Sequence, residues 1–231
     1  MKIISVRKGF ASDHSSTSYE FLAVDRPLNK AARAAVSSLS SRANPTRRRV
    51  SFIYHAEGYD IPGGWNPLMR NYYDVMYSES YGWWHLALAF PLPPKQQEEI
   101  VKYAFDGIED MGVDVSFYGE RVIVSIFCRL SGSFDDEESW ESFEEEDDED
   151  NGENASEDNF AAEADDPLLL LLVKMRRQLM EGDYRTLYEV WKMYGCSEDE
   201  EDKEGSKPPV PKGKKSGQEV IDQFAGMLDS I

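Results

Sequence analysis

Residues 18–25 constrain the fold of this chain more than any other stretch. They read Ser-Tyr-Glu-Phe-Leu-Ala-Val-Asp, and apolar side chains alternate on both sides of an extended backbone, with Glu20 as the only charge inside. A strand that is apolar on most of both faces belongs inside a sheet rather than at its edge. Arg26-Pro27 ends the strand, because proline cannot donate to a sheet ladder. We therefore expect a sheet built around this strand.

The remainder of residues 1–130 alternates between predicted strands and predicted helices. Strands are predicted over residues 2–6, 50–55, 83–90, 113–118 and 121–129, and helices over residues 30–41, 67–77 and 95–105. The stretch at 83–90 is again apolar on both faces and is expected to be central. This order predicts an α+β fold, with a small mixed or antiparallel sheet and helices packed on it. A ferredoxin-like sandwich is one arrangement of that kind.

The later part of the chain divides into four segments by composition. An acidic insert at 131–166 follows the globular domain of residues 1–130. A helical hairpin is predicted at 167–196, and we expect it to pack on the globular domain because it has more apolar surface than two short helices bury on each other. A Lys/Glu/Pro-rich linker at 197–216 precedes a terminal amphipathic helix at 217–231.

The net charge of -19 is concentrated in the acidic insert. Residues 135–166 hold 18 Asp and Glu and no Lys or Arg, whereas the parts before and after this stretch are close to neutral. Mutual repulsion and low apolar content predict a disordered segment. The protein is thus expected to be a nearly neutral globule that carries one anionic segment.

The cysteine count and the apolar runs favour a cytoplasmic protein. Only Cys128 and Cys196 are present, which is too few for a disulfide framework. The N-terminus lacks the apolar core of a signal peptide. The longest aliphatic run, at 168–173, is too short to cross a bilayer. No membrane contact is therefore expected.

Several stretches resemble one family of uncharacterised bacterial proteins. They include a YEFLAVDRPL-type strand at 19–28, a SLSSRANPT stretch at 38–46 and a GDYRTLY-type helical hairpin around 182–188. The resemblance also covers residues 71–90 and the PPVP run at 208–211. This family has no known activity, so the resemblance implies no catalytic residue.

Two groups of polar residues have the types that catalysis or metal binding uses. His14 lies in the loop Asp-His-Ser-Ser, which contains the residue types of a hydrolytic triad without the geometry that a triad needs. His55, Glu57 and Asp60 follow a predicted strand end, where sites often gather. A polar loop and ordinary strand-end polarity explain both groups more simply. We predict no catalytic residue, no cofactor and no metal site, and we interpret His85 as a structural histidine.

Nucleic acid is not an expected partner. Arg47-Arg48-Arg49 is the only basic run, and no wide basic face surrounds it. A solvated strand entry, or an internal partner for the acidic insert, explains the run at least as well.

A protein with a basic surface is the expected partner. The candidate contact residues are Trp140 and Phe143 in the acidic insert, Trp191 in the hairpin, and Phe224 and Leu228 in the terminal helix. The linker at 197–216 separates the terminal helix from the rest, which favours its use in partner binding. No pattern in the sequence indicates an oligomeric state.

These patterns predict a non-enzymatic protein-interaction or regulatory adaptor, which contacts its partner through the acidic tract and the apolar helices. One alternative is a small-molecule-binding or hydrolytic domain with its site at strand ends near His55. Another is an accessory protein of a bacterial defence or stress operon.

Overall fold

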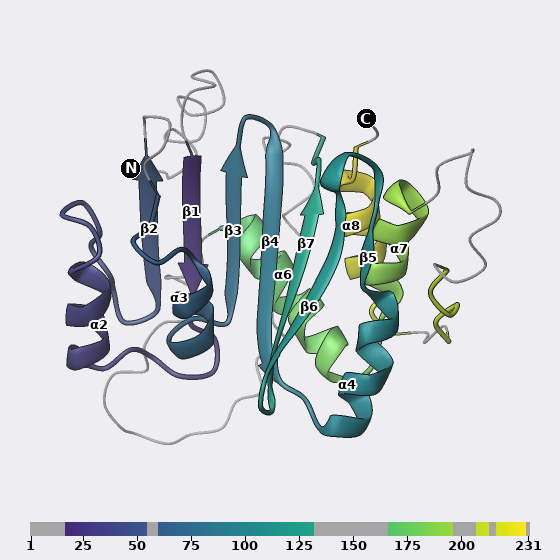
Figure 1. Cartoon of the computed structure of the whole chain (residues 1–231), viewed down its shortest axis with the longest axis horizontal. Helices are drawn as coiled ribbons and strands as arrows, with labels where there is room; N and C mark the ends of the chain where they lie inside the picture. Colours follow the sequence, from purple (N-terminus) through teal and green to yellow (C-terminus); the bar gives the residue numbers. More distant parts are fainter. Residues whose placement is uncertain (1–16, 55–59, 132–165, 196–206, 213–215, 230–231) are drawn as a thin grey trace, which may run out of the picture.

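The described strands form one antiparallel sheet of seven strands in the order β2-β1-β3-β4-β7-β6-β5 (Figure 1). The computed structural model describes residues 17–54, 60–131, 166–195, 207–212 and 216–229. The strands are β1 (Thr17–Leu22), β2 (Arg49–Tyr54), β3 (Val75–Ser80), β4 (Trp83–Pro91), β5 (Phe105–Asp106), β6 (Gly112–Tyr118) and β7 (Arg121–Cys128). The predicted α+β class is confirmed. Of the two kinds of sheet expected, mixed or antiparallel, the structure has the antiparallel one.

The strand that was expected to organise the fold is an interior strand. β1 pairs with β2 on one side and with β3 on the other, both antiparallel. Phe21 and Leu22 are both fully buried although they point to opposite faces of the sheet. Glu20 lies opposite Ser51 in β2 and Tyr77 in β3. The central position predicted for β4 is confirmed too, because β3 and β7 flank it.

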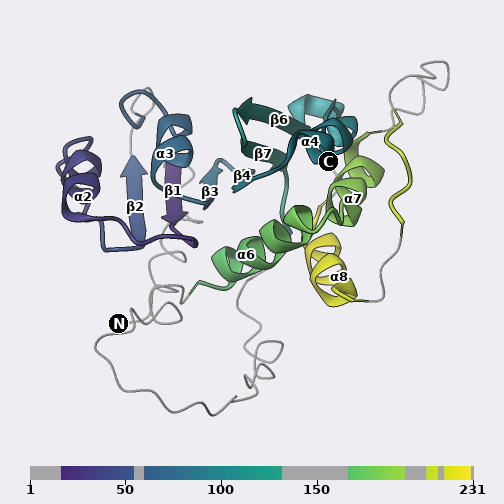
Figure 2. The ribbon, with the colours of Figure 1, turned by 90° about the horizontal axis from the view of Figure 1, so that it is seen from below.

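Helices cover both faces of the sheet (Figure 2). The α-helices are α2 (Lys30–Ser37), α3 (Asn66–Asn71), α4 (Pro94–Ile100), α6 (Pro167–Met180), α7 (Arg185–Tyr194) and α8 (Gln218–Met227), and the short 3-10 turns are η1 (Val101–Tyr103) and η2 (Ile108–Asp110). Helices α2 and α3 lie on one face, and α6 crosses the opposite face. As predicted, α2 begins after Asn29, whose side chain accepts a hydrogen bond from the Ala32 N–H.

Each face of the sheet has its own core. On the α6 side, strand residues such as Leu88 and Val124 pack with Leu172 and Leu187 of the C-terminal helices. On the other side, Phe21 packs with residues of α2 and α3 in a smaller cluster. The sheet is therefore the middle layer of three, which suits a strand that is apolar on both faces.

The helix predicted over residues 67–77 is wrong in its second half. Helix α3 ends at Asn71, and the chain then enters β3. Tyr81 and Gly82 have φ values of 55° and 79° and form the tight turn between β3 and β4. The short β5 was not predicted, and the strand predicted at residues 2–6 lies outside the described residues.

The expectation of a terminal helix separate from the rest is also wrong. Helix α8 packs against α6 and α7. Leu130, just beyond β7, forms an isolated antiparallel bridge with Leu228, just beyond α8. Tyr194 of α7 donates a hydrogen bond from its hydroxyl to the Asp229 carbonyl at 2.8 Å. None of the helices in the described ranges has the length and apolarity to cross a membrane.

Candidate functional site

Five of the residues proposed from the sequence lie outside the described residues. They are His14, His55, Glu57, Trp140 and Phe143. The disorder predicted for the acidic insert also concerns residues outside the described part, except at the two end residues, Ser131 and Asp166.

Asp60 is described, and it lies at the end of β1 and β2 that the strand-end hypothesis named. Its side chain accepts a hydrogen bond from the Ile61 N–H at 2.6 Å. It also forms a hydrogen bond with the Tyr19 hydroxyl, and burial followed by this bond raises the pKa of Tyr19. The contacts of Asp60 join its loop to β1, which is a structural role.

The three remaining candidate contact residues are buried, and Phe224 and Leu228 belong to the α6-side core. Phe224 has no exposed surface, and Leu228 and Trp191 are 6% and 8% exposed. The sequence suggested that they were free because a polar linker precedes the last helix. The fold buries these three residues because α6, α7 and α8 together cover one face of a seven-stranded sheet. In this fold, none of the three offers a free surface to a partner.

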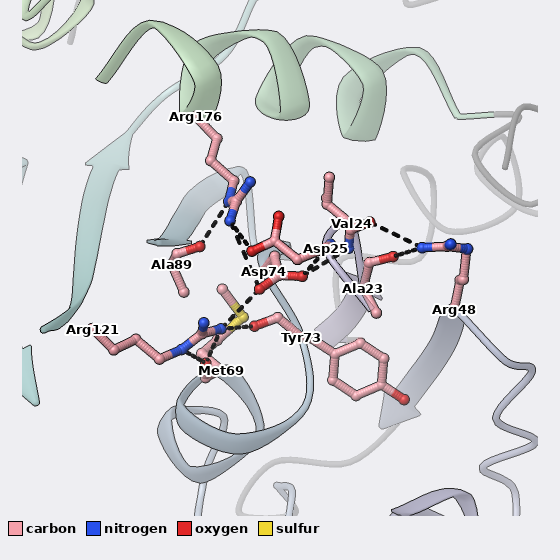
Figure 3. A network of polar contacts seen from close by, with 10 residues as sticks. All are labelled: Ala23, Val24, Asp25, Arg48, Met69, Tyr73, Asp74, Ala89, Arg121 and Arg176. Carbon is pink, nitrogen blue, oxygen red and sulfur yellow. Dashed lines mark hydrogen bonds and ion pairs between the residues drawn. The ribbon is translucent and has the colours of Figure 1, made fainter. Parts of the chain in front are cut away.

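A network of charged contacts centres on Asp74, where β1 ends and β3 begins (Figure 3). Asp74 is 5% exposed. Its Oδ2 accepts hydrogen bonds from the backbone N–H groups of Val24 and Asp25, at 2.8 and 3.0 Å. Its Oδ1 accepts one from Nη2 of Arg121 at 3.0 Å and lies 4.0 Å from Nη2 of Arg176. A buried carboxylate therefore holds two neighbouring strands and two guanidinium groups together.

The two arginines tie this network to other layers of the fold (Figure 3). Arg176 reaches down from α6, where its Nε donates to the Ala89 carbonyl at 2.7 Å and its Nη2 to Asp25 Oδ2 at 2.6 Å. Arg121, the first residue of β7, donates to the carbonyls of Met69 and Tyr73 at the end of α3. Charge-assisted bonds of this kind are stronger than neutral ones, so they fix the relative positions of sheet and helices.

An open cleft of ≈ 650 Å³ lies beside this network, between the start of α2 and the end of α3. Its polar side chains include Asp25, Arg26, Asn29, Arg70, Asp74 and Arg121. Both carboxylates in the cleft already accept hydrogen bonds from arginine side chains. Each carboxylate in the cleft is therefore already paired with a guanidinium group. It lies at the opposite end of the sheet from Tyr54, the residue before His55.

A second polar network lies under α6 and joins β1, β2 and β3. Glu20 accepts hydrogen bonds from Arg49 Nε and Nη2, at 3.1 and 3.0 Å, and from Ser51 Oγ at 2.7 Å. Asp166 accepts from the Tyr77 hydroxyl at 2.7 Å and from Arg49 Nη2 at 3.4 Å. Burial raises the pKa of Glu20, and Arg49 and Ser51 oppose that rise. Two buried carboxylates thus share one guanidinium.

The Asp166 contact bears out one interpretation of the basic run at residues 47–49. Asp166 is the last residue of the acidic insert, and Arg49 is its internal cationic partner. Asp166 also begins α6, because its Oδ1 accepts from the N–H groups of Leu168 and Leu169. Arg48 is used internally as well, since its guanidinium donates to the Ala23 and Val24 carbonyls.

His85 is the half-buried structural histidine that the sequence suggested. Its ring stacks on Phe127 with centroids 4.4 Å apart and meets the edge of Trp65 at 4.6 Å. Its Nε2 is buried without a hydrogen-bond partner. Burial lowers the pKa of His85 to about 4, because no partner stabilises the charged form.

We expect His85 to make the fold less stable as the pH falls from about 6.5 to about 4. The unfolded chain takes up a proton on this histidine at higher pH than the folded protein, so acid favours unfolding by up to about 3 kcal/mol. The measurement is urea unfolding across this pH range, compared with a His85→Leu variant. The variant should lose this part of the pH dependence, and equal pH slopes would contradict the assignment.

The described residues contain neither a group of side chains that could bind a metal ion nor an exposed thiol. No group of three or more His, Cys, Asp or Glu there is placed to hold a metal ion. Cys128 is fully buried in β7, and burial raises the pKa of its thiol. It is therefore a core side chain in its neutral form.

The sequence offered one signal for the Asp74 network that was not used. Arg176 lies within the apolar stripe of α6, where Leu172, Met175 and Leu179 are fully buried. A charge on a buried helix face needs a partner, so such a position predicts a buried ion pair. Asp74 and Arg121 had no comparable signal, because both lie at element ends where polar residues are common.

Comparison with protein-family models, with curated proteins and with solved structures finds no match for this chain. The resemblance to a family of uncharacterised bacterial proteins therefore stays a prediction. Function has to be inferred from the contacts, charges and cavities described above.

Proposed function

We propose that this protein is a non-enzymatic interaction protein that contacts a basic protein partner through its acidic segment. The observation that carries the proposal is the composition of residues 132–165, which hold 17 Asp and Glu and no Lys or Arg. A segment of one charge raises the rate at which an oppositely charged partner is encountered and selects against acidic partners.

The fold supports this proposal at the two ends of the segment. Ser131 donates its backbone N–H to the carbonyl of Met227, the last residue of α8, at 2.8 Å, which ties the first end to that helix. Asp166 is 2% exposed and is bound by Tyr77 and Arg49 at the second end. The two residues that flank the acidic segment are therefore both attached to the folded body.

The helix part of the predicted contact receives less support. Helix-in-groove docking needs a row of exposed apolar residues on one helix face. On the described helices α6, α7 and α8, the large exposed apolar side chains are Leu170 and Met193, at 38% and 37% exposure. They stand alone on different helices, so the proposal rests on charge.

The decisive experiment compares three forms of the full chain as baits for affinity capture from the source cells. One is unchanged, one has every Asp and Glu of residues 132–165 replaced by Asn and Gln, and one has the same residues in scrambled order. We expect the neutral form to lose the basic proteins that the unchanged form captures, since steering requires the charge.

The scrambled form should keep these proteins, and higher salt should release them. Identical recoveries with the neutral form would remove the acidic segment from the proposal. If the scrambled form fails like the neutral form, the order of residues, including the positions of Trp140 and Phe143, matters more than the charge alone.

A further inference from the structure

The cleft beside Asp74 contains more positive than negative charge. Three arginines line it, at positions 26, 70 and 121, and two carboxylates, Asp25 and Asp74. Arg176 adds a fourth guanidinium from beneath, within 2.6 Å of Asp25 Oδ2. Arg121 and Arg176 balance the two carboxylates, so the charges of Arg26 and Arg70 remain uncompensated.

These two arginines are placed to receive a ligand. Both are exposed, and neither has a carboxylate partner among the residues that the structure describes. The Arg70 guanidinium lies 4.2 Å from the ring centroid of Tyr118, which holds it in place through a cation–π contact. None of the hydrogen bonds of Arg121 uses Nη1, which leaves that group for a further acceptor.

The start of α2 adds to the same positive field. Asn29 caps this helix and lines the cleft together with Ala32. The first turn of α2 contains no acidic residue. The N-terminus of a helix carries a partial positive charge and favours anions close by. The start of a helix and two arginines without a carboxylate partner among the described residues thus line one cavity.

We propose that this cleft binds the phosphate group of a small phosphorylated molecule, between Arg26 and Arg70. Two uncompensated positive charges match a phosphate monoester, which carries about -1.5 to -2 charges at neutral pH. Guanidinium groups bind phosphate oxygens in a bidentate fork. The volume of ≈ 650 Å³ exceeds what a phosphate ion fills and falls in the range of ligand pockets. The organic part of the ligand would contact Leu28, Tyr72 and Pro91.

The test is calorimetric titration of the full chain with inorganic phosphate, AMP, adenosine and succinate. We expect AMP and phosphate to bind and adenosine not to bind. An Arg26→Gln/Arg70→Gln variant should weaken AMP binding about tenfold or more, since it removes two charge-assisted contacts. Arg177→Gln is the matched control, because this arginine lies on α6 outside the cleft and its side chain is 84% exposed.

Amide NMR on the same samples locates the binding. AMP should shift the signals of Arg26, Asn29 and Asn71, which line the cleft. Unchanged AMP affinity in the double variant, or no saturable phosphate or AMP binding, would overturn the proposal. Binding of succinate without AMP would identify a carboxylate site and overturn the phosphate assignment. The form with a neutral acidic segment should bind AMP as before, so this test is independent of the proposed protein partner.

Discussion

Replacing Asp74 with alanine is expected to lower the free energy of unfolding by about 3–5 kcal/mol. The carboxylate accepts hydrogen bonds from two backbone N–H groups and from Arg121, and it lies beside Arg176. Asp74→Ala leaves the two N–H groups and Arg121 without this acceptor, while Arg176, which is only 4% exposed, keeps its ion pair with Asp25. Buried donors that lose their acceptor keep the cost of their desolvation. The large effect thus comes from the groups left behind.

Urea unfolding followed by circular dichroism measures this loss. Glu181→Ala is the matched control, because it also removes a carboxylate from an arginine, here Arg177 at 3.3 Å, in an exposed pair. An exposed pair of this kind contributes about 0.5 kcal/mol or less. Asp74→Asn should fall between the two, since the amide keeps an acceptor and loses the charge. A loss for Asp74→Ala no larger than that of Glu181→Ala would show that the network does not stabilise the fold.

The parts of the fold that the sequence predicted well are those with local signals. β1 and β4 are apolar on both faces, and only interior strands of a covered sheet have this pattern. The starts of α2 at residue 30 and of α6 at residue 167 were predicted correctly, because a capping side chain such as Asn29 and a proline in the first turn act on neighbouring residues alone. Such features need no knowledge of distant contacts.

β3 was missed because its residues fit a helix equally well. Leu68, Tyr72, Val75 and Met76 have helical spacing, and this apolar run alternates too briefly to reveal a strand. Tertiary contacts decide the outcome, since Asp74 binds the end of β1 and the following residues pair with β1 and β4. β-branched Val75 and the Tyr81-Gly82 turn were the available hints.

The candidate sites were harder to predict than the fold. The polar residues near His55 suggested a site because histidine is rare in this chain. The cleft, in contrast, is lined by arginines and carboxylates, which are common in it. Arg26, Arg70 and Arg121 come from three places in the sequence, and only the antiparallel pairing of β1, β3, β4 and β7 brings them to one end of the sheet. No local spacing encodes such a cluster.

Phe224→Ala tests the largest difference between prediction and structure, which is whether the terminal helix stands apart or belongs to the core. We expect it to lower the free energy of unfolding by about 3–5 kcal/mol, because it empties a fully buried ring position in the core between α6, α7 and the sheet. A terminal helix that stood apart, as the polar linker suggested, would lose almost nothing. The same substitution therefore separates a core helix from a free one, and urea unfolding of the full chain measures it.

Val210→Ala is the matched control for Phe224→Ala, since it also removes apolar atoms from the C-terminal part but at a residue that is 70% exposed. Its effect should stay within about 0.5 kcal/mol. If both substitutions had equally small effects, α8 would not be part of the core. With the expected difference, α8 closes the α6-side core after the linker at 197–216, and its bond to Ser131 holds the residue that precedes the acidic segment. The last helix would then contribute both to the stability of the fold and to holding the residue from which the acidic segment begins.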